Sequence, residues 1–167
     1  PVSEETADVS GYSVRGGRIL YKAYPWTDIH NLYDGIYLYD TATGENRCLL
    51  EKDVRRTGMI GFWADHEAVV ASSGDNPYGD GKYMDFYTMN LESGEMKLLT
   101  PYEYSSGSGS VGSDARLGGG RTVKTGDGIC WFVTTRGDSA HLYSISRDKT
   151  LKEVVTDRGS CDSFDIQ

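Results

Sequence analysis

The pattern of hydrophobic and polar positions predicts a unit of strand, tight turn and strand, and this unit occurs three times along the chain. The clearest copy covers residues 86–100, where the stretches FYTMN and MKLLT flank a polar turn that contains Gly94. Similar copies cover residues 36–50 and 142–156, at offsets of 50 and 56 residues. Periods of this size are typical of repeat architectures.

A second hairpin is expected before each of these copies. Gly16 and Gly17 separate two strand-like runs, and glycine supplies the positive φ angles that a two-residue hairpin turn needs. Corresponding runs cover residues 61–71 and 123–133. Consecutive apolar residues, as at 68–70, are typical of a strand that is covered on both faces. The pattern predicts an all-β fold, a partial β-propeller of about three four-stranded antiparallel blades.

Apolar residues coincide in the third strand of the three repeats. The coinciding positions are first Tyr37, Tyr87 and Tyr143, and two residues later Tyr39, Met89 and Ile145. Side chains two residues apart on a strand point the same way, so each blade should present a matching apolar stripe.

The repeats predict one partial propeller domain over residues 1–167. Its blades cover about 1–56, 57–113 and 114–158, and residues 159–167 begin a next blade. Closed propellers have roughly four to eight blades, so an arc of this size leaves apolar blade faces bare at both ends. We therefore expect a larger propeller, or copies of the chain that associate through those faces as a homo-oligomer.

The acidic composition narrows the classes of partner. The formal net charge is −8 at pH 7, and an acidic surface repels phosphate backbones, so we expect no nucleic-acid partner. No apolar run approaches the roughly 20 residues that span a bilayer, so we expect no membrane partner. The widely spaced Cys48, Cys130 and Cys161 are typical of free, buried thiols in a reducing compartment. These features predict a cytoplasmic protein.

The loops that differ between the repeats are the expected binding surface, because propellers place function on their loops. Residues 24–35 and 72–81 join the second and third strands of their blades, and a glycine-rich connector covers residues 102–120. The candidate binding residues on this loop surface are Trp26, Tyr78 and Arg116. For the aromatic residues, the alternative is that the loop packs onto its own blade.

Three stretches partly match motifs of catalysis or ligand binding. Residues 107–112 read G-x-G-x-x-G, but the dinucleotide motif needs a buried strand before it and a helix after it. Residues 137–141 approach G-x-S-x-G but join two strands, whereas a nucleophile elbow joins a strand to a helix. Residues 75–81 lack the ligand spacing of an EF-hand, so a polar loop is favoured over a calcium site.

The histidines have no metal-ligand spacing either. We expect all of them to be solvated residues of loops or turns; they are His30, His66 and His141. The sequence therefore predicts no catalytic residue, no cofactor and no metal site in this chain.

Residues 82–100 and 131–143 resemble blades of the prolyl oligopeptidase family, especially of its acylaminoacyl-peptidase branch. Residues 155–156 and 162–166 continue the resemblance, which covers nearly the whole chain. TolB-like propellers share the same sequence pattern, in which a strand and a turn are followed by Leu-Leu-Thr. In the peptidase family, an N-terminal propeller precedes an α/β-hydrolase domain with a Ser-Asp-His triad and limits substrates to short peptides.

The resemblance implies that this chain is a non-catalytic part of a serine peptidase, because no stretch matches the triad. Its implied partners are the hydrolase domain of the same longer chain and short peptides, which the propeller gates or docks. The alternative is a free-standing protein-binding module, comparable to TolB-like or WD-repeat propellers.

Overall fold

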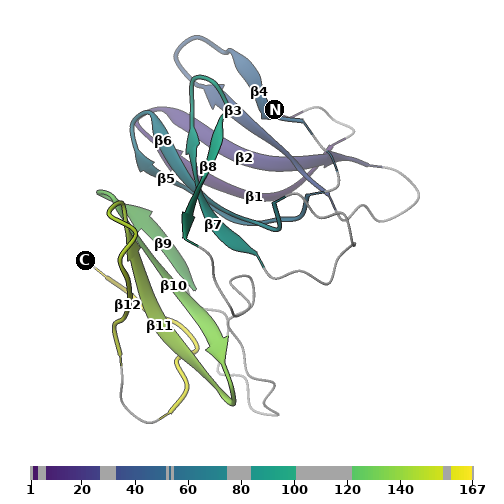
Figure 1. Cartoon of the computed structure of the whole chain (residues 1–167). Helices are drawn as coiled ribbons and strands as arrows, with labels where there is room; N and C mark the ends of the chain where they lie inside the picture. The colour runs from purple at the N-terminus through teal and green to yellow at the C-terminus, as the bar shows by residue number, and fades with distance from the viewer. Residues whose placement is uncertain are drawn as a thin grey trace.

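The described part of the computed structural model contains β-strands and no helix, and the strands form three antiparallel sheets (Figure 1). The structure describes residues 2–3, 7–26, 33–51, 53, 55–74, 84–100, 122–155 and 159–166. The first sheet contains β1 (Ala7–Arg15), β2 (Arg18–Pro25), β3 (Gly35–Asp40) and β4 (Asn46–Leu50). The second contains β5 (Thr57–Ala64), β6 (Glu67–Ser72), β7 (Asp85–Asn90) and β8 (Met96–Thr100). The third contains β9 (Val123–Gly126), β10 (Ile129–Arg136), β11 (Ser139–Ser146) and β12 (Leu151–Glu153).

Each sheet is a simple meander, in which neighbours along the chain are neighbours in the sheet. Gly16 and Gly17 close the first hairpin with φ angles of 55° and 76°, as the Gly-Gly pair predicts. The corresponding turn of the third sheet has Asp127 at φ 51° and Gly128 at φ 77°. The prediction of about three four-stranded antiparallel blades is confirmed.

The turn between the third and fourth strands has the same construction in the first two sheets. Asp40 Oδ1 accepts hydrogen bonds from the amides of Ala42 and Thr43, and Asn90 Oδ1 does the same for Glu92 and Ser93. Short side chains of this kind favour such local turns. A glycine at positive φ completes each turn.

The third strands of the three sheets, β3, β7 and β11, place equivalent residues at equivalent positions of each sheet. Tyr37, Tyr87 and Tyr143 each lie three residues before the residue whose amide closes the turn to the fourth strand, which is Asp40, Asn90 or Ser146. The predicted equivalence of the three tyrosines is therefore confirmed.

Apolar side chains fill the space between successive sheets. One core joins the first and second sheets; its buried residues are Leu20, Ile36, Leu38, Ile60, Phe62, Ala68, Val70, Met89 and Leu91. A second core joins the second and third sheets; its buried residues are Trp63, Val69, Ala71, Phe86, Leu99, Cys130, Phe132, Tyr143 and Ile145. The middle sheet is therefore covered on both faces, which explains the apolar runs in its strands.

The two ends of the stack differ, which corrects the expectation of two bare faces. On the first sheet, Val9, Tyr12 and Val14 are 47%, 71% and 61% exposed. On the third sheet, the outward cluster of Val133, Ala140 and Leu142 is buried, because Cys161 and Phe164 pack against it.

Residues 159–166 form no strand in the structure. Their assignment to the start of a next blade stays a prediction.

The cysteines also depart in part from expectation. Cys130 is buried in the second core, as predicted, but Cys48 is exposed and Cys161 is partly exposed. Cys48 is opposite Tyr37 on β4, and Tyr37 is opposite Tyr21. Opposite residues of paired strands share a face, so Cys48 lies on the face of the first sheet that points away from the second sheet.

Candidate functional site

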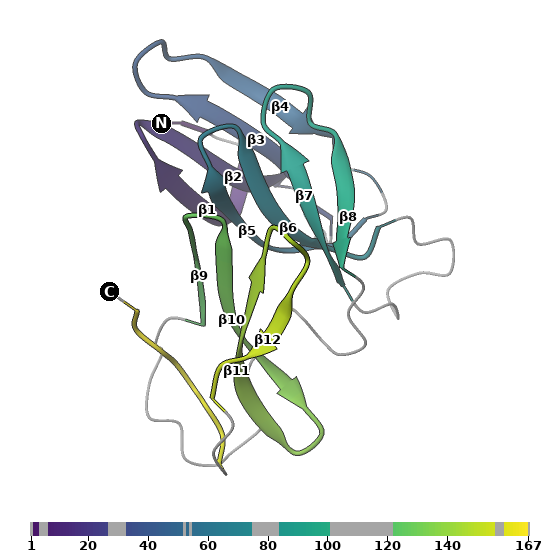
Figure 2. The same ribbon diagram turned by 60° about the vertical axis from the view of Figure 1, so that its left-hand side comes forward.

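The first strands of the three sheets, β1, β5 and β9, lie next to one another (Figure 2). They line a groove of about 640 Å³. This volume is in the range typical of small-ligand sites. The lining residues are Ser10, Gly11, Tyr12, Ser13, Lys22, Gly58, Met59, Ile60, Thr122, Val123, Lys124 and Thr125. Hydroxyl groups, backbone and two lysines therefore dominate the lining.

Lys22 lies almost entirely buried at the side of this groove, with a side chain that is 9% exposed. Its Nζ donates a hydrogen bond to the carbonyl oxygen of Thr57 at 2.8 Å and lies 3.4 Å from Oδ2 of Asp34. A buried ammonium is costly unless it is paired and hydrogen-bonded, and these two contacts meet that need. Lys22 thus links β2 of the first sheet to the start of β5 in the second.

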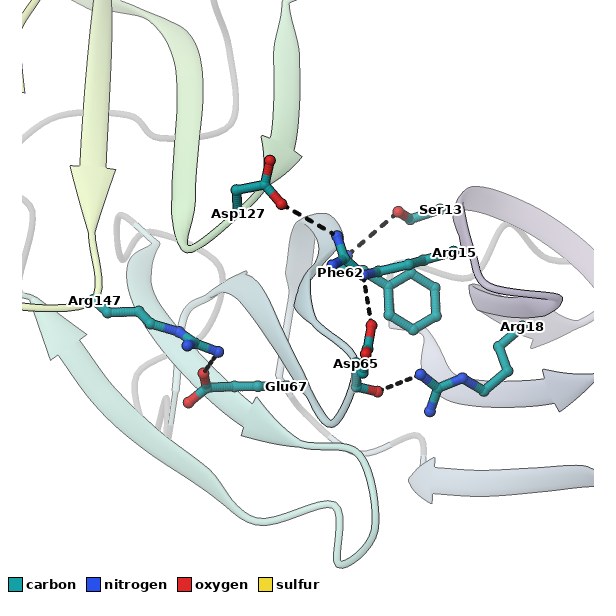
Figure 3. Close-up of polar contacts among 8 residues, drawn as sticks. All are labelled: Ser13, Arg15, Arg18, Phe62, Asp65, Glu67, Asp127 and Arg147. Atoms are coloured by element: carbon teal, nitrogen blue, oxygen red, sulfur yellow. Dashed lines mark hydrogen bonds and ion pairs between the residues drawn. The ribbon is translucent and has the colours of Figure 1, made fainter.

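One end of the groove has a polar network that joins all three sheets (Figure 3). Arg15 Nε lies 2.9 Å from Asp65 Oδ1, and Arg15 Nη1 lies 3.9 Å from Asp127 Oδ1. Arg18 donates to the backbone oxygen of Asp65. The hairpin turns of the second and third sheets are therefore both tied to the first sheet.

Two further contacts extend this network. The amide of Phe62 donates to Oγ of Ser13 at 3.3 Å, which joins β5 to β1 inside the groove. Arg147 Nη2 lies 2.6 Å from Glu67 Oε2, which joins the third sheet to the second (Figure 3). Residues that line the groove are thus held by contacts across the blade boundaries.

The network makes a prediction about pH. The Arg15 guanidinium, through its hydrogen bond and its charge, holds the pKa of the Asp65 carboxyl below its usual value. A lowered pKa in the folded protein means that this contact stabilises the fold above the unfolded pKa. The contribution is lost as the pH falls through the lowered folded pKa.

A titration of the carboxyl groups by ¹³C NMR checks this prediction. We expect Arg15→Gln to raise the pKa of Asp65. The pKa of Asp148 is also lowered, but by Ser146 and Thr150, and it should stay unchanged in the variant. An unchanged pKa of Asp65 in Arg15→Gln would contradict the assigned cause.

Of the predicted binding residues, the structure describes Trp26 alone. Trp26 follows β2 and is 64% exposed, so its indole is available to a ligand or partner. Tyr78 and Arg116 lie outside the described residues, and so do His30, the loop 75–81 and the stretch 107–112. The assignment of these three residues to a binding surface therefore stays a prediction.

Strands β10, β11 and β12 together hold a hydrogen-bonded group that the sequence did not reveal. Ser139 Oγ lies 2.8 Å from His141 Nε2, and His141 Nδ1 contacts Glu153 Oε1. Arg136 Nη1 lies 3.6 Å from Glu153 Oε2, and Ser139 Oγ also donates to Asp138 Oδ1 at 3.3 Å. The order serine, histidine, carboxylate is that of a catalytic triad.

This group corrects the prediction that His141 is a solvated turn residue. His141 lies on strand β11 with a side chain that is 21% exposed. Residues 137–138 form the hairpin turn between β10 and β11, so the stretch 137–141 does connect two strands, as predicted. His66 does lie in a turn, and its side chain is 74% exposed.

Within the described ranges, no three His, Cys, Asp or Glu residues are placed to hold a metal ion. Burial strongly raises the pKa of the Cys130 thiol, which keeps it in the unreactive protonated form. The residues that the structure describes also contain no helix suited to crossing a membrane.

Comparisons with solved structures identify the architecture. The chain superposes on a puromycin hydrolase with a TM-score of 0.67 at 14% identity, covering 93% of this chain and 23% of that one. It superposes on TolB from Acinetobacter baumannii with a TM-score of 0.60 at 17% identity, covering 95% and 35% of the two chains. The fold is a partial β-propeller.

A third structure gives the same picture. A puromycin-hydrolyzing peptidase of Mycobacterium tuberculosis matches with a TM-score of 0.61 at 14% identity, covering 92% of this chain and 23% of that one. The partial propeller therefore spans about a quarter to a third of the length of the structures it matches. No family model and no curated protein matches the sequence.

Proposed function

We propose that this chain is a non-catalytic part of the β-propeller domain of a cytoplasmic serine peptidase that resembles acylaminoacyl-peptidase. In this proposal, an α/β-hydrolase domain of the same longer chain performs the catalysis. The propeller gates or docks short peptides on their way to that domain. The observation that supports the proposal is the match of nearly the whole chain to part of two larger structures, a puromycin hydrolase and a puromycin-hydrolyzing peptidase.

The physical role of the propeller would be steric and electrostatic. Sheets that pack face to face form a rigid wall, and loops at the blade ends restrict what passes. The exposed Trp26 offers one aromatic contact for a peptide or for the hydrolase domain. The overall charge of −8 repels acidic peptides at long range.

The reading frame past Gln167 tests the proposal directly. We expect further blades and then a G-x-S-x-G stretch on a strand-to-helix turn, which is the site of the nucleophile in α/β-hydrolases. A stop codon shortly after Gln167 would contradict the peptidase assignment.

An activity assay tests whether this chain is non-catalytic. With p-nitrophenyl acetate, we expect the same slow hydrolysis for the unmodified chain and for Ser139→Ala. Ser146→Ala is the matched control, because Ser146 bonds to Asp148 at a turn and not to a histidine. Ester turnover that disappears in Ser139→Ala but persists in Ser146→Ala would show that the Ser139, His141 and Glu153 group is catalytic.

The match to TolB favours a second candidate function. In that alternative, the chain belongs to a free-standing propeller module that binds other proteins through its loops. The same reading of the gene separates the two, since a module has no hydrolase domain after its blades.

A further inference from the structure

The groove between β1, β5 and β9 differs in charge from the rest of the chain. The chain contains 25 acidic residues and 17 lysines and arginines. None of the described residues that line the groove is Asp or Glu, whereas two of them, Lys22 and Lys124, are cationic. A local cationic site in an acidic protein selects an anionic group.

The two lysines are not equivalent. The charge of Lys22 is offset by Asp34, 3.4 Å away and buried with it. Lys124 has no carboxylate partner within the described ranges, and its Nζ donates to the backbone oxygen of Ile166. Among the described residues of the groove lining, Lys124 is therefore the cation without a carboxylate partner, and it contacts a backbone oxygen.

The walls of the groove offer backbone groups as well. β1, β5 and β9 are each at the edge of their sheet, so one side of each strand has no strand partner in its sheet. Edge strands present N–H and C=O groups that pair with an added extended peptide. The longest of the three edges is β1, which has nine residues.

A glycine keeps the wall open beside Lys22. Gly11 lies at the irregularity of β1, where the register with β2 shifts after Val9. A Cβ atom at Gly11 would lie 3.3 Å from Cε of Lys22. The missing side chain thus leaves room for the lysine stem under the edge strand.

We propose that this groove binds a short extended peptide along an edge strand, with the C-terminal carboxylate of the peptide at Lys124. The inference rests on the proposed handling of short peptides and names the surface and the chemical group involved. The ligand class is a short peptide with a free C-terminal carboxylate and β-branched side chains, which favour the extended conformation.

Fluorescence anisotropy with two labelled peptides tests the proposal on the unmodified chain. The probes are fluorescein-Ala-Val-Ala-Val with a free C-terminal carboxylate and the same peptide as its C-terminal amide. We expect the free acid to bind about tenfold more tightly, as for one charge-assisted hydrogen bond. Equal affinity of the two probes, or no saturable binding of either, would overturn the proposal.

A variant pair locates the carboxylate. Lys124→Gln should remove the difference between acid and amide, whereas Lys152→Gln on β12, outside the groove lining, should preserve it. A loss of the difference in Lys152→Gln as well would show general charge attraction and overturn the assignment to Lys124. The acid–amide comparison needs no variant, so it holds even if Lys124→Gln folds poorly.

The outcome is separable from that of the proposed function. A failure of peptide binding in a chain whose gene continues into a hydrolase domain overturns this inference alone. A clear preference for the free acid in a chain without such a domain keeps the groove as a peptide site and removes the peptidase assignment.

Discussion

Truncation of Phe132 to alanine is expected to lower the free energy of unfolding by about 3–5 kcal/mol. Phe132 is fully buried between the second and third sheets. Its ring lies 4.6 Å from that of Phe86 at 45° and 5.9 Å from that of Tyr143 at 19°. The variant loses this burial and leaves a cavity between two blades, so both the transfer and the cavity contributions act against the fold.

Urea unfolding of the variant measures this loss. Trp26→Ala is the control, because it removes a larger aromatic side chain from an exposed position and should change stability by less than about 0.5 kcal/mol. If Phe132→Ala is too unstable to measure, Phe132→Leu should still unfold at lower urea than the unmodified chain. Equal stability of Phe132→Ala and Trp26→Ala would contradict the packing of the third sheet on the second.

Gly94→Ala is expected to destabilise the chain by about 2–4 kcal/mol, well beyond the same change at Gly44. Gly94 and Gly44 occupy equivalent positions in the equivalent turns of the second and first sheets, with φ angles of 74° and 73°. A Cβ at Gly94 would lie 2.1 Å from the carbonyl oxygen of Leu49 in the first sheet, whereas one at Gly44 would have open space. Both alanine variants therefore carry the strain of a positive φ angle, but only Gly94→Ala also brings a Cβ atom into the carbonyl oxygen of Leu49.

Thermal unfolding of the two variants separates these effects. Gly44→Ala should show the cost of the left-handed backbone, about 1–2 kcal/mol. Gly94→Ala should show that cost together with the displacement of the neighbouring sheet. Equal shifts in the two variants would mean that the second sheet does not approach Leu49 as described.

The hairpins and their order could be predicted because their signals are local. Gly16 and Gly17 set a turn by their own backbone freedom, and Asp40 and Asn90 bond to amides two and three residues away. The fifty-residue spacing then places Tyr37 and Tyr87 at matching positions. These hairpins could be predicted from the sequence because each turn depends on residues only a few positions apart in the chain.

The candidate site depends on contacts between sheets, which local patterns do not encode. Lys22 is a polar residue in an apolar strand, and its burial depends on Asp34 and on the backbone of Thr57 in another sheet. Arg15 reaches Asp65 and Asp127, which are 50 and 112 residues away in sequence. No periodicity in the sequence indicates these pairs.

Part of the group formed by Ser139, His141 and Glu153 could have been predicted from the sequence. Ser139 and His141 are two residues apart on a strand, so their side chains share a face, and this spacing was the available signal. Glu153 enters through the register of β12, which places it opposite Tyr143. The weak apolar pattern of β12 left that register undetermined in the sequence.

The contact between the rings of Phe86 and Phe132 gives the most direct test that successive sheets stack as propeller blades. The measurement is a nuclear Overhauser experiment on the chain with labelled phenylalanine. We predict a strong cross-peak between the two rings, because their centres lie 4.6 Å apart on different sheets. Assigned signals from both rings without such a cross-peak would contradict the stacked arrangement on which the groove and the proposed function depend.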